Sequence, residues 1–116
     1  MALGESAGSV GMKMFVEDTG RAHVCGPGTI PMKTLDSYEF SDVDLIKIDV
    51  EGYELQVVKG AAKTIAQSRP IIILEQRGCE IKNFGECESG QALRYLDEMG
   101  MRRIWKIEHD WVLGWP

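Results

Sequence analysis

Four acidic residues and one tyrosine are the side chains of this 116-residue sequence whose types and spacing could do chemistry. Asp49, Glu51, Tyr53 and Glu54 lie at or just past the end of one apolar run, and Glu75 follows a second. Open α/β sheets bind their ligands at the carboxyl ends of parallel strands, where these side chains would meet. Carboxylates gathered there could also hold a hard cation, and Asp49, Glu51 and Glu75 form that alternative.

Each of these residues also has a purely structural interpretation. The acids after the first run could stabilise the start of the following helix, where free N–H groups and the helix dipole favour negative charge. Glu75 could cap a helix or a loop in the same way. Tyr53 could pack its ring against the core and leave its hydroxyl exposed.

Lys47 interrupts the first apolar run with a cation. An unpaired ammonium group is costly to bury, so a partner or an exposed position is required. We expect Lys47 to pair with Asp49 or Glu75, or to reach the sheet edge, rather than to act in catalysis.

Two apolar runs, residues 45–50 and 71–74, predict buried parallel strands. Between them, apolar residues recur at helical spacing and predict one helix, in which Gly60 is a weak point and which Arg69-Pro70 ends. The apolar positions of this helix are Leu55, Val58, Ala62 and Ile65.

The carboxyl-terminal part predicts a second helix followed by a hairpin. Ser89 is a suitable N-cap for this helix, and Gly100 is a suitable residue just past its end. Residues 102–107 and 111–115 predict two strands, and the short link at residues 108–110 makes them antiparallel.

The amino-terminal part is rich in glycine and predicts hairpins. The expected strands are residues 10–16, 22–25 and 30–35, with turns at 17–20 and 26–28 and a polar connection at 36–39. From residue 44 onward the order is β-α-β-α-β-β. The sequence therefore predicts an α/β fold, a parallel sheet with an antiparallel terminal hairpin, in one domain over residues 1–116.

Composition excludes several classes of protein. Lys and Arg number 13 against 18 Asp and Glu, for a net charge of −5 without a basic stripe, so nucleic-acid binding is not expected. The three cysteines form no CxxC pair, which indicates free thiols in a reducing, cytoplasmic setting. No membrane association is expected, because the longest apolar run, residues 71–74, is too short to cross a bilayer and no signal peptide is present.

Four phrases of the sequence resemble the carboxyl-terminal half of FkbM-type methyltransferases. They are Thr34-Leu-Asp36, residues 43–54 (VDLIKIDVEGYE), Val58-Lys-Gly-Ala61 and residues 69–75 (RPIIILE). The resemblance implies an S-adenosylmethionine-dependent enzyme, most often an O-methyltransferase, with a Rossmann-like sheet. The strands expected from residue 45 onward would be the fourth to seventh of that sheet.

The resemblance also implies roles for the acids. Asp49 and Glu51 would lie beside the reacting centre as catalytic residues, and Glu54, Glu75 and Tyr53 would bind the substrate. Methyl transfer to a hydroxyl group needs alignment of the reactants and a base for one proton.

The earlier half of the family's sheet, with its glycine-rich turn and ribose-binding acid, has no counterpart in this sequence. At about 30 residues per βαβ unit, it would need on the order of a hundred residues before Ser9. We therefore expect a truncated, methyltransferase-like domain without independent activity and without identified cofactor-binding residues. The alternative is a non-catalytic, oligomeric binding or regulatory module.

Without the earlier strands, residues 45–50 would form an open sheet edge, which invites pairing with another chain. Either residues 10–16 fold over and supply a neighbour, or two copies join along the edge or an apolar face. We expect a homo-oligomer, most simply a dimer, or a separately encoded partner half. Three tryptophans near the carboxyl terminus favour core packing, with an interface as the alternative: Trp105, Trp111 and Trp115.

Overall fold

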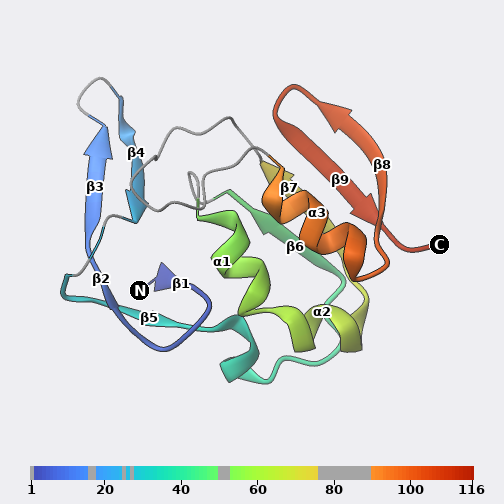
Figure 1. The fold of residues 1–116 in the computed structure, drawn as a ribbon, viewed down its shortest axis with the longest axis horizontal. Coiled ribbons are helices and arrows are strands. Elements are labelled where there is room, and N and C mark those ends of the chain that lie inside the picture. The colour runs from blue at the N-terminus through green and yellow to red at the C-terminus, as the bar shows by residue number, and fades with distance from the viewer. Residues whose placement is uncertain (1, 16–17, 25, 27, 50–52, 76–89) are drawn as a thin grey trace.

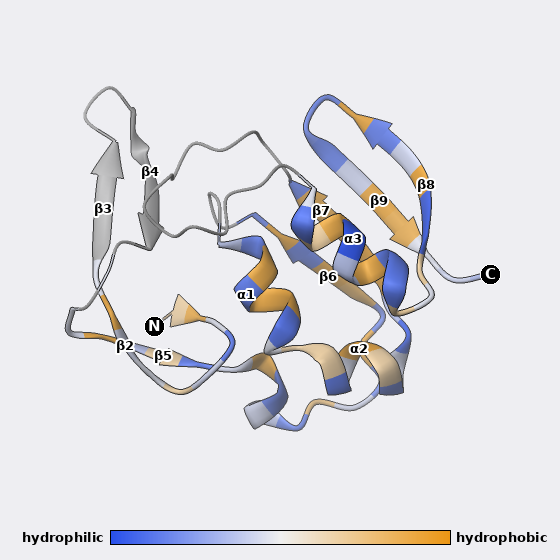
Figure 2. Cartoon of the chain, viewed as in Figure 1, coloured by the Kyte–Doolittle hydropathy of each residue, from blue (hydrophilic) through white to orange (hydrophobic). Residues whose placement is uncertain are grey.

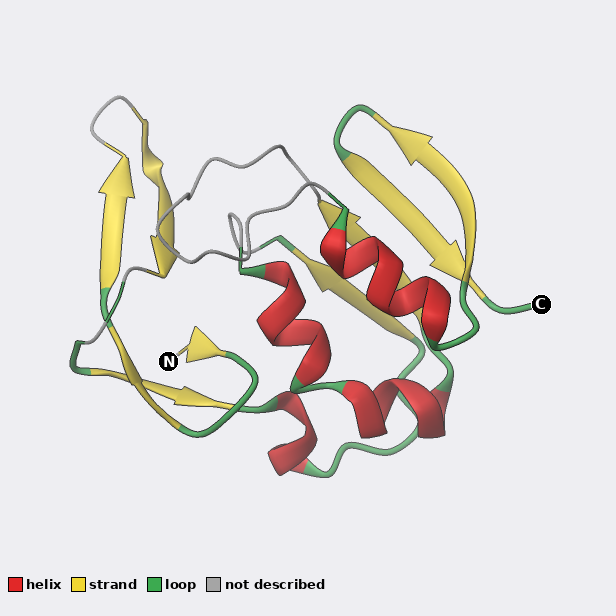
Figure 3. Ribbon diagram, viewed as in Figure 1, coloured by secondary structure: helices red, strands yellow, loops and turns green. Residues whose placement is uncertain are grey.

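The computed structural model describes residues 2–15, 18–24, 26, 28–49, 53–75 and 90–116. Within them, the strands form three sheets, of which one has four strands, one has three and one has two (Figure 3). The four-stranded sheet contains β6 (Leu45–Ile48), β7 (Ile71–Glu75), β8 (Arg102–Ile107) and β9 (Asp110–Gly114). Its strand order is β6-β7-β9-β8.

The predicted strand directions are confirmed in this sheet. Strands β6 and β7 are parallel, with Ile48 opposite Leu74, and β9 runs antiparallel to both β7 and β8. The β8–β9 turn falls at the predicted link, and Glu108 turns the chain there with φ of 54°. The chain from residue 45 onward is thus a mixed α/β unit with a parallel pair and an antiparallel hairpin.

Three α-helices cover one face of this sheet: α1 (Glu54–Lys59), α2 (Ala62–Ser68) and α3 (Gln91–Glu98) (Figure 1). Figure 2 shows apolar residues in all three helices and in β6 and β7. The core between the layers is built from aliphatic side chains, among them Ile48, Val58, Ile65, Ile72, Leu74, Leu96 and Leu113. Of the apolar positions predicted for the helix after β6, Val58 and Ile65 are fully buried, whereas Leu55 and Ala62 are half-buried.

The single helix expected after β6 is instead two short helices, and this prediction was wrong. The break lies at Gly60 and Ala61, between α1 and α2. Gly60 is buried, and a Cβ atom there would collide with the backbone oxygen of Gly4. The carbonyl of Gly60 also accepts a hydrogen bond from Asp36 N at 2.9 Å. The amino-terminal segment and residue 36 both dock at the break, so tertiary contacts end the helix.

Helix α3 ends as predicted but begins one residue later than expected. Gly100 has φ of 102°, and its N–H donates to the carbonyl of Asp97 at 3.0 Å. Met101 N donates to the carbonyl of Leu96 at 3.1 Å, which completes a Schellman motif. The N-cap is Gly90, with φ of 89°, rather than Ser89, which lies outside the described residues.

The amino-terminal region forms the other two sheets. In the first, β5 (Ile30–Lys33) lies between β1 (Ala2–Leu3) and β2 (Gly8–Val10). In the second, β3 (Met12–Phe15) pairs with β4 (Asp18–Val24) in an antiparallel hairpin. The hairpin prediction is confirmed.

Three details of that region differ from the prediction. Residues 10–16 do not form one strand, because Gly11 separates β2 from β3 and donates its N–H to the carbonyl of Gly26 at 2.9 Å. Residues 18–20 belong to β4 rather than to a turn. The polar connection is a 3₁₀ helix, η1 (Leu35–Tyr38), which Thr34 caps by accepting a hydrogen bond from the backbone N–H of Ser37.

Strand β6 lies at one edge of the four-stranded sheet and pairs there with β7. Residues 10–16 do not supply a second neighbour, since β2 pairs with β5 and β3 pairs with β4. That suggested way of covering the edge was wrong. Within the described residues, no helix has both the length and the apolar character needed to cross a bilayer.

Candidate active site at the carboxyl ends of the parallel strands

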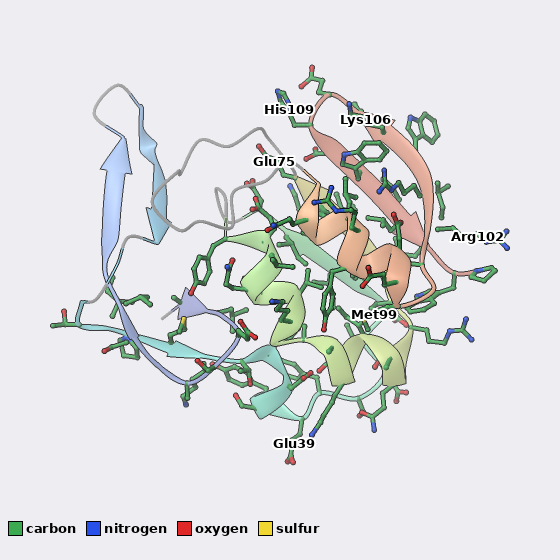
Figure 4. The ribbon with its side chains drawn as sticks, viewed as in Figure 1. Glu39, Glu75, Met99, Arg102, Lys106 and His109 are labelled. Atoms are coloured by element: carbon green, nitrogen blue, oxygen red, sulfur yellow. The ribbon has the colours of Figure 1, made fainter. Side chains whose placement is uncertain are left out.

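Asp49 and Glu75 occupy matching positions on neighbouring parallel strands. Asp49 follows the last residue of β6 directly and is exposed, and Glu75 is the last residue of β7 and is half-buried. Because Ile48 pairs with Leu74, the next positions along the two strands are Asp49 and Glu75. Adjacent strands lie about 4.8 Å apart, so the carboxylates of Asp49 and Glu75 lie next to each other at this edge of the sheet. We call this pair of residues the carboxylate rim. Figure 4 shows Glu75 at the end of the sheet that also carries the β8–β9 turn with His109.

Tyr53 and Glu54 lie where α1 begins, close to this rim in sequence. Tyr53 is the N-cap residue of α1, and its hydroxyl donates to Met32 Sδ at 3.6 Å, which ties the helix start to β5. Glu54 lies in the first turn of α1 and is only 4% exposed. A carboxylate at that position is favoured by the free N–H groups of the helix. Burial of Glu54 therefore supports its structural interpretation, and its substrate-binding role stays a prediction.

Lys47 reaches solvent from the middle of β6. It is exposed, whereas Ile48 beside it is 2% exposed and faces the helices. Successive strand residues point to opposite faces, so Lys47 lies on the sheet face that α1, α2 and α3 do not cover. The cost of burying a cation, which required a partner, does not arise here.

The alternative of a carboxylate metal site finds no support among the described residues. Within residues 2–15, 18–49, 53–75 and 90–116, apart from positions 25 and 27, no group of three His, Cys, Asp or Glu side chains could hold a metal ion. Glu51, the other predicted catalytic residue, lies outside the described residues.

A polar cavity of about 600 Å³ lies at the other end of the parallel strands. It is formed around η1 and α2, and its lining residues are Thr34, Asp36, Ser37, Glu39, Phe40, Ser41, Lys63, Thr64 and Gln67. Figure 4 shows Glu39 and Glu75 at opposite ends of the molecule. The cavity is therefore separate from the carboxylate rim.

Asp36 has a structural role that its position in the sequence alone did not reveal. Its Oδ1 accepts from Thr64 N and Thr64 Oγ1, both at 2.8 Å, and its Oδ2 accepts from Lys63 N at 3.1 Å. These N–H groups belong to the first turn of α2, so Asp36 caps a helix that begins 26 residues later in the chain. Thr34-Leu-Asp36 was one of the four family phrases, but no local pattern indicated a remote cap.

The sequence profile of the FkbM methyltransferase domain matches residues 26–103. The chain belongs to the FkbM methyltransferase family. The matched part runs from just before β5 into β8, so it includes the remote cap Asp36 and both rim acids, Asp49 and Glu75. Among curated proteins, none matches this sequence.

A solved structure agrees with this family membership at the level of the fold. The chain superposes on methyltransferase FkbM from Methylobacillus flagellatus KT with a TM-score of 0.50 and 19% sequence identity. The similarity covers 96% of this chain and 26% of that protein. This FkbM-family chain therefore spans about a quarter of the length of that methyltransferase.

Proposed function

We propose that this chain supplies the carboxylate rim of an S-adenosylmethionine-dependent O-methyltransferase site. One observation carries the proposal: Asp49 and Glu75 end neighbouring parallel strands inside the region that matches the FkbM domain. The carboxyl ends of such strands are where open α/β folds bind their ligands. Fold likeness alone would not decide the chemistry.

In this proposal Asp49 accepts the proton of the acceptor hydroxyl while the methyl group is transferred. Its exposure beside the strand end suits that role, because a general base must lie within hydrogen-bond reach of the proton it takes. Glu75 orients the acceptor, and Glu51 is the second catalytic residue, beside Asp49. Tyr53 and Glu54, at the start of α1, bind the acceptor in the same proposal.

We propose that the described residues supply only part of the cradle for the methyl donor. The elements before β6 are β1 to β5 and η1, with no helical crossover between parallel strands among them, and the described cavity lies away from the rim. The proposal is that the chain lacks independent activity, and that a partner half or a second copy completes the site. A cytoplasmic location and the absence of nucleic-acid binding belong to the same proposal.

Millimolar S-adenosylmethionine is expected to leave the melting temperature of the isolated chain unchanged. A ligand that binds only the native state must raise that temperature, and 1 mM of a ligand with a Kd near 100 μM would add about 1.4 kcal/mol. For a domain of this size that is a rise of several degrees. Differential scanning calorimetry with S-adenosylmethionine and S-adenosylhomocysteine decides the point. A rise of more than 2 °C with either compound would show that the chain holds the donor unaided.

The rim itself is testable by NMR, which detects contacts too weak to shift the melting temperature. At 10 mM, S-adenosylmethionine is expected to perturb the backbone amides of Asp49 and Glu75 more than S-adenosylhomocysteine does, because only the former carries the positively charged sulfonium group that carboxylates attract. Asp49→Asn should reduce these changes at least threefold. Asp44→Asn, which alters the acid at the amino end of the same strand, should not.

Two results of that titration would contradict the rim assignment. One is a set of perturbations centred on the cavity around η1 and α2. The other is an equal response to the sulfonium compound and to its thioether product, which would show that the rim carboxylates do not face the sulfonium group. Either result would favour the alternative function, a non-catalytic binding module, which an exposed apolar sheet face also supports.

A further inference from the structure

Exposed apolar side chains gather on the face of the four-stranded sheet that the helices leave open. All described helices near this sheet lie on its other side (Figure 1). Five large apolar residues of the sheet are between 47 and 64% exposed: Leu45, Ile71, Ile104, Trp105 and Ile107. This set, which we call the open face, comes from three of the four strands.

The register of β6 and β7 places the first two residues on that side. Ile72 and Leu74 are fully buried beneath the helices. Because side chains alternate along a strand, Ile71 points to the opposite side, and Leu45 pairs with it across the ladder. Leu45 and Ile71 are therefore neighbours on the open face.

Contacts to Trp111 show on which face of the sheet the side chains of β8 lie. Trp111 packs against the core, and Arg103 Cζ and Lys106 Nζ lie 5.2 and 5.1 Å from its ring centre. These two residues therefore belong to the helix side. Trp105, paired with Val112, belongs to the open face.

A β-bulge adds one more apolar side chain to the open face. The register shifts between Arg103 and Trp105, so Ile104 is the extra residue of β8. The side chain of Ile104 fills the space that a Cβ atom on Gly114 would occupy. Gly114 lies two residues after Val112 and therefore on the same, open side of β9. Ile104 and Trp105 thus project to the same face, and Ile107, opposite Asp110, lies farther along it.

The open face is large enough to form the centre of a protein interface. With about 100 Å² left on each of five side chains, it presents roughly 500 Å² of apolar surface, near the upper end of what monomeric proteins expose. A standard interface buries about 800 Å² on each partner, with an apolar centre and a polar rim. The half-buried Ile73 and Val112 lie between the five residues and join them, and the exposed Lys47, opposite Ile73, is the charged side chain on the β6 side of the same face.

The charges around the open face are arranged in a way that suits a second copy of the chain. Arg102 lies at one end of the strands, and Glu75 and Asp110 lie together at the other (Figure 4). The exposed Lys47 lies on the same face between these two ends, opposite Ile73. When two copies face each other with their strands running in opposite directions, the basic end of each meets the acidic end of the other. A twofold axis produces that arrangement twice in one interface.

We propose that the open face binds the open face of a second copy, so that two sheets pack face to face. The proposal goes beyond the methyltransferase assignment and does not depend on it. It also differs from pairing along the β6 edge. That edge offers only four residues, whereas the exposed apolar surface continues to Trp105 on β8, the opposite edge of the sheet.

Analytical ultracentrifugation of the chain over a range of micromolar concentrations tests the proposal. We expect a species of twice the 12.9 kDa chain mass, and Trp105→Glu should weaken its formation by roughly a hundredfold, because a buried Trp commonly dominates an interface. The matched control is Phe40→Glu, which introduces the same charge at an exposed aromatic residue outside the open face. It should leave the association unchanged.

Circular dichroism of each variant ensures that a loss of association is not a loss of folding. Ile107→Glu provides a second, independent change on the same face and should act in the same direction. A wild-type chain that stays monomeric at every concentration would overturn the proposal. So would a dimer that resists both substitutions, which would instead point to pairing along the β6 edge.

Discussion

Replacing Asp36 by alanine is expected to lower the free energy of unfolding by about 2–4 kcal/mol, as measured by urea denaturation. The change removes all three hydrogen bonds that the carboxylate accepts from Lys63 and Thr64. Thr64 is 3% exposed, so its N–H and hydroxyl would lose a charged acceptor that water from the adjoining cavity replaces only in part. Leaving buried donors unsatisfied is what makes the expected loss larger than that of an ordinary surface cap.

Three further variants separate the cap from a general charge effect. Asp36→Asn keeps one carbonyl oxygen as an acceptor and should cost about half as much as alanine. Glu98→Ala removes an exposed acid from α3 and should change stability by less than 0.5 kcal/mol, the typical range for surface positions.

Thr64→Val removes only the hydroxyl partner, and the double mutant with Asp36→Ala should show a coupling of about 1 kcal/mol. Additive losses, with no coupling, would contradict the remote cap.

The elements that build the rim were predictable because their signals are local. The apolar run from residue 45, the acids after it and the helical spacing that follows all indicated a strand leading into a helix, and β6 and α1 confirm this order. The antiparallel hairpin at the carboxyl terminus was equally clear from its two short strands and tight link. For the same reason the register places Asp49 and Glu75 side by side, as the sequence suggested.

The features that were missed depend on residues far apart in the sequence. The cap from Asp36 to α2 joins positions 28 residues apart, and no pattern within either segment requires it. The three tryptophans look alike in sequence but differ in the fold. Trp111 and Trp115 pack against the core, and Trp115 Nε1 donates to the carbonyl of Pro70 at 2.9 Å, whereas Trp105 is 64% exposed. Which face a residue of β8 occupies was decided by a bulge that alternation alone does not predict.

Replacing Gly60 by alanine is expected to destabilise the fold by about 2 kcal/mol or more, although helix propensity alone predicts a gain of nearly 1 kcal/mol. The φ of Gly60 is −74°, a helical value that alanine adopts readily, so backbone strain is not the cause. The cause is space. A methyl group at this position would overlap the backbone oxygen of Gly4 and come within 3.3 Å of Thr34 Cβ. Backbone atoms on one side and a packed residue on the other leave little room for relaxation.

Whether Gly60→Ala raises or lowers the free energy of unfolding separates the two explanations for the break between α1 and α2. Gly8→Ala is the matched control, because a Cβ there meets nothing within 4 Å, and it should be neutral or slightly stabilising. Hydrogen exchange adds a local measurement. If the amino-terminal segment is pushed away in Gly60→Ala, the amides of Gly4 and Asp36 should exchange faster, since they donate to the carbonyls of Lys33 and Gly60. A stabilised Gly60→Ala variant with unchanged exchange would mean that the helix is broken by the weak propensity of glycine and not by the segment packed against it.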